Sequence, residues 1–80
     1  MVKERIPLTD MNAGESGKVI EFLGGAGMRK RLSSMGIRAG GKISKVSSAF
    51  KRGPVVIKVG ASQTAIGHGM SCKIMVEVDR

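Results

Sequence analysis

Glycine spacing constrains this chain more than any other feature of its sequence. Twelve glycines divide the 80 residues into short, mostly apolar segments, and they lie at positions 14, 17, 24, 25, 27, 36, 40, 41, 53, 60, 67 and 69. Glycines placed between short apolar segments are typical of a compact β-rich domain with tight turns. A chain of this length has room for one modest core, so we expect residues 1–80 to form a single domain.

Four segments have the residue pattern of strands. The clearest begins at Cys72. In it Cys72, Ile74, Val76 and Val78 alternate with Lys73, Met75, Glu77 and Asp79. Further strands are expected at 19–23, 43–49 and 54–59, and a weaker turn at 63–66. Within 43–49, Ile43 and Val46 lie three residues apart, which predicts either a bulge or partial pairing. Short strands with tight turns favour a small barrel, because an open sheet would leave its edges unprotected.

One segment has helical periodicity instead. From 27 to 35 the apolar residues are Met28, Leu32 and Met35, at the spacing of one helix face. Gly36 is placed to end the helix in the left-handed conformation, with Ile37 folding back over the last turn as in a Schellman motif. The expected fold class is therefore mainly β, a small barrel of about five strands with one short α-helix at about 27–35.

The charge and the scarcity of aromatic residues point to different partners. Fourteen Lys and Arg against six acids give a net charge of +8, which suits a phosphate backbone. Base stacking needs aromatic platforms, however, and the chain has only Phe22 and Phe50. The alternative is that the charge serves solubility or an acidic protein surface. With a single Cys and no apolar stretch suited to a signal peptide or a membrane span, we expect a cytoplasmic protein.

The segment 31–40 reads R-L-S-S-M-G-I-R-A-G, and with Gly24-Gly25 before it and Gly53-Pro54-Val55 after a basic loop it resembles the FeoA family. The resemblance extends over essentially the full chain. It implies an SH3-like β-barrel and a cytosolic accessory role in ferrous iron uptake, with FeoB, a membrane transporter that carries a cytosolic GTPase domain, as partner. The same fold occurs as the C-terminal domain of iron-dependent repressors. Position 45, often apolar in relatives, is Lys45 here.

Neither a metal site nor a catalytic site is predicted. His68 and Cys72 lie four residues apart, but two ligands fall short of the four in a structural site, and Gly67 and Gly69 disfavour a helix between them. We therefore expect Cys72 to be a buried strand residue. No cofactor is expected to bind. The alternative, which rests on association with the family, is that the protein binds a transition metal ion such as iron. No nucleophile, base and orienting acid can be identified, so we do not expect an enzyme or a small-molecule substrate.

The most distinctive charged feature is the run 29–31 on the predicted helix. Consecutive residues fan around a helix, so at most two of the three can face one partner surface. With Phe50 as an anchor, the predicted partner-binding residues are Arg29, Lys30, Arg31, Arg38, Phe50, Lys51 and Arg52. The alternative is a solvated helix face. The main hypothesis is that the protein binds and modulates a FeoB-type transporter and contacts the membrane only through that partner. The second hypothesis is a small basic SH3-like module that binds nucleic acid or acts as a metal-dependent regulator.

Overall fold

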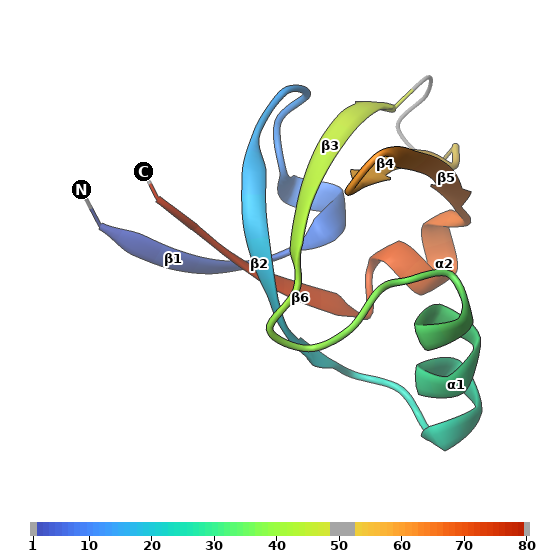
Figure 1. Ribbon diagram of the computed structural model, residues 1–80. Coiled ribbons are helices and arrows are strands. Elements are labelled where there is room, and N and C mark those ends of the chain that lie inside the picture. Colours follow the sequence, from blue (N-terminus) through green and yellow to red (C-terminus); the bar gives the residue numbers. More distant parts are fainter. Residues whose placement is uncertain (1, 49–52, 80) are drawn as a thin grey trace.

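A computed structural model describes residues 2–48 and 53–79, which form one antiparallel sheet with two helices beside it (Figure 1). The elements in chain order are β1 Lys3–Pro7, a 3₁₀ turn Leu8–Asp10, β2 Ser16–Phe22, α1 Ala26–Ser34, β3 Lys42–Ser48, β4 Val55–Val59, β5 Ser62–Ile66, α2 His68–Ser71 and β6 Ile74–Asp79. The sheet order is β1-β6-β2-β3-β4-β5. Neither helix of the described residues is long and apolar enough to cross a membrane.

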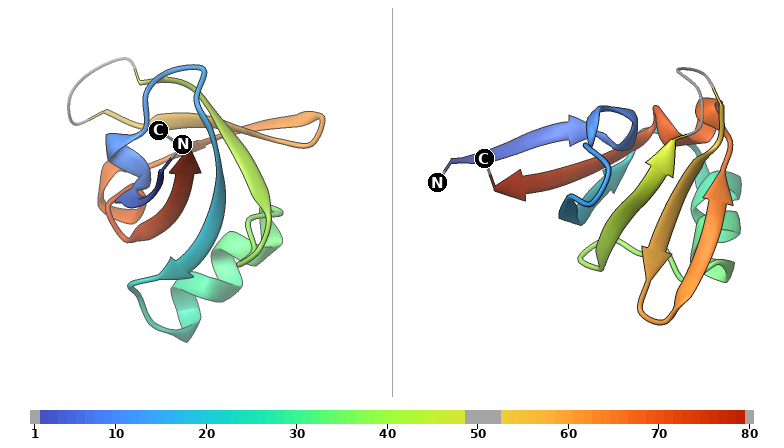
Figure 2. Two further views of the ribbon diagram at one scale, coloured as in Figure 1. Left: turned by 90° about the vertical axis from the view of Figure 1, so that its left-hand side faces the viewer. Right: turned by 90° about the horizontal axis from the view of Figure 1, so that it is seen from above.

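The sheet is strongly coiled, and the ends of β1 and β6 near the two termini extend beyond the rest of it (Figure 2). These two strands pair along their length from Lys3 opposite Asp79 to Pro7 opposite Met75, which brings the two ends of the chain together. The predicted mainly-β, barrel-like fold is confirmed, with six strands in place of about five. In the described residues the barrel is not closed, since β1 and β5 are opposite edges of the sheet.

The core is built from both the sheet and α1. On β6 the predicted alternation is confirmed, because Ile74, Val76 and Val78 are buried while Asp79 is exposed. Leu32 is the residue of α1 that is fully buried, and Met28 and Met35 pack against the core while remaining partly exposed. The buried apolar residues are Leu8, Met11, Val19, Leu32, Ile37, Ile43, Val55, Ile57, Ile66, Ile74, Val76 and Val78.

The predicted end of α1 is confirmed in detail. Gly36 has φ +84°, the left-handed conformation, and its N–H donates to the Ser33 carbonyl at 3.0 Å. The Ile37 N–H donates to the Leu32 carbonyl at 2.9 Å, which completes the Schellman pattern. Ile37 and Leu32 are both fully buried, so the cap also directs the chain back into the core.

The irregular strand β3 contains a bulge, which is one of the two explanations that its residue spacing allowed. Its pairing with β4 shifts register between Lys45 and Ser47, which leaves Val46 on the exposed side and turns Lys45 inward. Lys45 is 4% exposed, and its Nζ donates to the Met11 carbonyl at 2.6 Å and to the Thr9 carbonyl at 3.2 Å. Burial lowers the pKa of Lys45, and the carboxylates of Asp10 and Glu15 offset part of this effect.

Three expectations about local structure were wrong or incomplete. Strand β1 was not predicted, because its first three residues are all exposed and show no apolar alternation. The segment 63–66 lies in β5 rather than in a turn. Finally, His68–Ser71 is a short helix despite its glycine, so Cys72 caps that helix and is exposed instead of beginning a buried strand.

Candidate docking surface

Helix α1 presents the basic run to solvent. Gly25 is its N-cap residue, and the Met28 and Arg29 N–H groups donate to the Gly25 carbonyl at 3.1 and 3.2 Å. Burial of Leu32 fixes the rotation of the helix, which leaves Arg29, Lys30 and Arg31 exposed. Arg31 lies in the last turn, where a positive charge interacts favourably with the helix dipole.

Arg29 and Arg38 border a cavity of about 290 Å³ between β2 and α1, called here the β2–α1 cavity. Its apolar lining includes Ile20 and Phe22 from β2, which are half-buried, and Ile37 after the helix cap. Two arginines therefore line the cavity beside apolar residues, together with one acidic residue, Glu21. The full lining is Ile20, Glu21, Phe22, Arg29, Ser33, Ile37, Arg38 and Ala39.

Arg31 belongs to a different hollow, on the side of α1 that faces α2. This α1–α2 cavity of about 310 Å³ is lined by Gly27, Met28, Arg31, Gly69, Met70 and Lys73. Lys30 lines neither cavity. The three consecutive basic residues are thus divided between two hollows and open solvent, and only Arg29 shares a site with Arg38.

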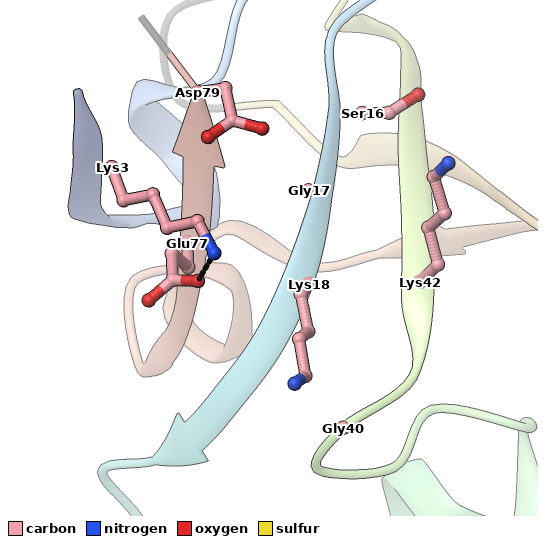
Figure 3. A pocket seen from close by; sticks show the side chains of 8 residues that line it. All are labelled: Lys3, Ser16, Gly17, Lys18, Gly40, Lys42, Glu77 and Asp79. Carbon is pink, nitrogen blue, oxygen red and sulfur yellow. Dashed lines mark ion pairs between the residues drawn. The ribbon is translucent and has the colours of Figure 1, made fainter. Parts of the chain in front are cut away.

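A third cavity, of about 360 Å³, lies against strands of the sheet and has mixed charge (Figure 3). The Lys3 ammonium is 3.8 Å from a Glu77 carboxylate oxygen, and an exposed pair of this kind contributes little to stability. Lys18 and Lys42 extend in opposite directions along β2 and β3 (Figure 3). The lining is Lys3, Ser16, Gly17, Lys18, Gly40, Lys42, Glu77 and Asp79, so acids interrupt the basic surface.

The structure places the predicted partner-binding residues unevenly. Arg29 and Arg38 are brought together at one cavity, Arg31 borders another, and Lys30 stands apart. Phe50, Lys51 and Arg52 lie outside the described residues. Sequence reasoning did not identify Ile20 or Phe22 as part of the site. The sequence signal for them is the run 19–23, which has apolar residues on both faces of the expected strand.

Metal ligands are sparse in the described part of the chain. Its residues contain no group of three or more His, Cys, Asp or Glu side chains that could hold a metal ion. The structure nevertheless brings His68 and Cys72 together, with the Cys72 Sγ 3.4 Å from the His68 Nε2.

Comparison with known proteins identifies the family. The FeoA domain model matches residues 6–78. A curated Fe(2+) transport protein A of Methanocaldococcus jannaschii is 41% identical over 71 residues, which is 89% of this chain and 84% of that protein. The crystal structure of an iron uptake regulatory protein (FeoA) is 37% identical with a TM-score of 0.83, covering 94% of this chain and 99% of that one.

The fold also occurs as part of a longer protein. The IdeR of T. acidophilum has a TM-score of 0.84 at 18% identity, covering 94% of this chain but 34% of its own, so it is similar in fold alone. The family match and the two more similar proteins extend over nearly all of the chain. This chain therefore belongs to the FeoA domain family, a family of small proteins associated with Fe²⁺ transport.

Proposed function

We propose that this chain is a non-enzymatic, cytosolic accessory protein of ferrous iron uptake that docks on the cytosolic part of a FeoB-type transporter and modulates its activity. Family membership supports the association with Fe²⁺ transport. The observation that carries the docking step is the β2–α1 cavity, in which Arg29 and Arg38 border an apolar lining.

This arrangement suits a partner segment with an apolar side chain beside one or two carboxylates. The apolar group would fill the cavity against Ile20 and Phe22, and the carboxylates would accept hydrogen bonds from the guanidinium groups. Arginine is the residue best adapted to such contacts, since its planar fork matches a carboxylate in two bonds. The cavity interior would contribute most of the affinity, because buried anchors outweigh exposed charges in protein interfaces.

The experiment measures binding of the purified chain to the cytosolic GTPase domain of the FeoB-type transporter from the same organism by isothermal titration calorimetry. The double variant Arg29→Glu with Arg38→Glu is expected to lower the affinity at least about tenfold, because docking would bury each reversed charge against a like charge. Ile20→Asp should have a comparable effect by placing a carboxylate in the apolar lining.

Lys30→Glu is the control, since it reverses one charge on α1, half the charge change of the double variant, at a residue that lines neither cavity. Its affinity should stay within about threefold of the unmodified chain, as is usual for a charge at the rim of an interface. Equal losses in Lys30→Glu and the double variant would show that general charge attraction, and not the cavity, drives binding. Absence of binding to the transporter at low salt would refute the docking proposal.

A further inference from the structure

The chain's single His begins the short helix α2, and its single Cys is the C-cap residue of the same helix. The Cys72 N–H donates to the His68 carbonyl at 3.0 Å, which places the two residues one helical turn apart. Their side chains meet, with Cys72 Sγ and His68 Nε2 separated by 3.4 Å. Cys72 is exposed and His68 is half-buried, so a cation in solution has access to both atoms.

The separation of the two atoms matches that of a metal-bound pair. Typical Zn–S and Zn–N bonds of about 2.3 and 2.0–2.1 Å at a tetrahedral angle place the sulfur and nitrogen about 3.5 Å apart. The observed distance is 3.4 Å, so a cation could be accommodated with little change in either side chain. From this geometry we propose that His68 Nε2 and Cys72 Sγ form a bidentate site for a borderline divalent cation of the zinc and cobalt class.

The turn that carries the pair is held by residues on its other side. The buried Ser71 donates through its Oγ to the Gly67 carbonyl at 3.0 Å and to the Ile66 carbonyl at 3.3 Å. Met70 packs against the core, and its N–H donates to the Gly67 carbonyl at 3.2 Å. Because these contacts are made within the protein itself, cation binding has little ordering of the turn to supply.

The ligand chemistry favours particular cations. Imidazole with thiolate suits zinc, cobalt and nickel, and Fe²⁺ lies below these three in the affinity order for such sites. The described residues supply no third ligand of the usual kinds, so water fills the remaining positions. His68 and Cys72 do not line the β2–α1 cavity, so the site is separate from the proposed docking surface. Its ligands favour zinc, cobalt and nickel over Fe²⁺.

The test is a Co²⁺ titration of the reduced protein, followed by absorbance. A thiolate-to-Co²⁺ charge-transfer band should appear and saturate at one cation per chain. His68→Ala and Cys72→Ser should each weaken binding at least about tenfold, since even residues that only orient metal ligands contribute that much. Lys73→Ala, which alters the adjacent exposed residue and keeps both ligands, is the matched control and should bind as the unmodified chain does.

Alkylation supplies a second measurement that does not depend on the band. Zn²⁺ should slow the reaction of Cys72 with iodoacetamide in the unmodified chain and in Lys73→Ala, but much less in His68→Ala. Unchanged Co²⁺ affinity in His68→Ala would overturn the proposal, because the thiolate alone would then be the ligand. An end point at half an equivalent with dimer formation would also overturn it, since the cation would then be shared between chains.

Discussion

At the scale of single residues, Lys45 is the clearest case of a side chain whose role depends on structure far along the chain. The bulge in β3 turns it inward, where its ammonium donates to the carbonyls of Thr9 and Met11. It thereby ties the 3₁₀ turn after β1 to the middle of the sheet. From sequence, the poor alternation of β3 was visible, but the two carbonyls that accept from Lys45 were not, because they are more than 30 residues away.

The lowered pKa of Lys45 predicts a specific pH dependence of stability. The unfolded chain keeps the Lys45 proton up to the ordinary pKa of 10.5, whereas the folded chain releases it at lower pH. Between these values the unfolded state binds more protons, so the contribution of Lys45 to the free energy of unfolding rises with pH. Urea unfolding at several pH values from 7 to about 10.5 should show the unmodified chain gaining stability relative to Lys45→Met.

The comparison with Lys45→Met isolates this residue, because the two proteins differ only at position 45. The quantity to follow is how the difference in unfolding free energy between the two proteins changes with pH. At neutral pH its sign is not decisive, because Lys45→Met removes two hydrogen bonds and also removes the cost of burying a charge. A difference in unfolding free energy that stays constant over the alkaline range would contradict a lowered pKa for Lys45.

At the scale of elements, replacing glycine by alanine is expected to change the stability of the protein in opposite directions at the two ends of α1. Gly27 lies inside the helix with open space around it, so Gly27→Ala should stabilise the protein by about 0.5–1 kcal/mol. Gly36 has φ +84° at the helix end, where a Cβ costs about 1–2 kcal/mol. A Cβ at Gly36 would meet Val59 at an ordinary 3.7 Å, so the cost of Gly36→Ala is conformational.

Thermal or urea unfolding of Gly27→Ala and Gly36→Ala measures whether each variant is more or less stable than the unmodified chain. Gly36→Asn serves as a control, because asparagine tolerates the left-handed conformation better than alanine and should recover part of the loss. Equal destabilisation by alanine and asparagine at this position would show that side-chain crowding, and not backbone conformation, limits the site.

The elements also show where sequence patterns suffice. Helix α1 and the alternation in β6 were predictable because each buries apolar residues at a regular spacing, and the irregularity of β3 was visible because that spacing is broken between Ile43 and Val46. Strand β1 is an exposed edge, and charged residues there protect the edge instead of filling a core. Helix α2 escaped prediction because Ser71 and Met70 hold it through contacts with Gly67 and the core, which outweigh the unfavourable Gly69.

At the scale of the whole molecule, the net charge of +8 is distributed rather than concentrated. Arg29 and Arg38 stand at one cavity, and Arg31 and Lys73 at another. The candidate site was therefore only half predictable. The helix and its charges follow from local periodicity, whereas the cavity depends on how β2 lies against α1, which no local pattern contains.

This distribution predicts weak, unspecific binding to nucleic acid. In the cavity of Figure 3, three lysines share the lining with Glu77 and Asp79, and those acids repel phosphates. If three or fewer phosphates are contacted at once, affinity for a duplex should fall by less than about a hundredfold between 50 and 200 mM salt, where six to ten contacts would lose 10³ or more. Fluorescence anisotropy with a labelled random-sequence duplex measures this slope.

Comparison of the docking and DNA experiments then distinguishes the two proposed functions, both of which rely on the same basic residues. Arg29→Glu with Arg38→Glu should lower transporter binding through the β2–α1 cavity, whereas Lys30→Glu should alter duplex binding as much as any single reversal, because phosphate attraction is insensitive to the cavity. A duplex complex that persists at physiological salt and prefers one sequence would favour the nucleic-acid-binding alternative over docking.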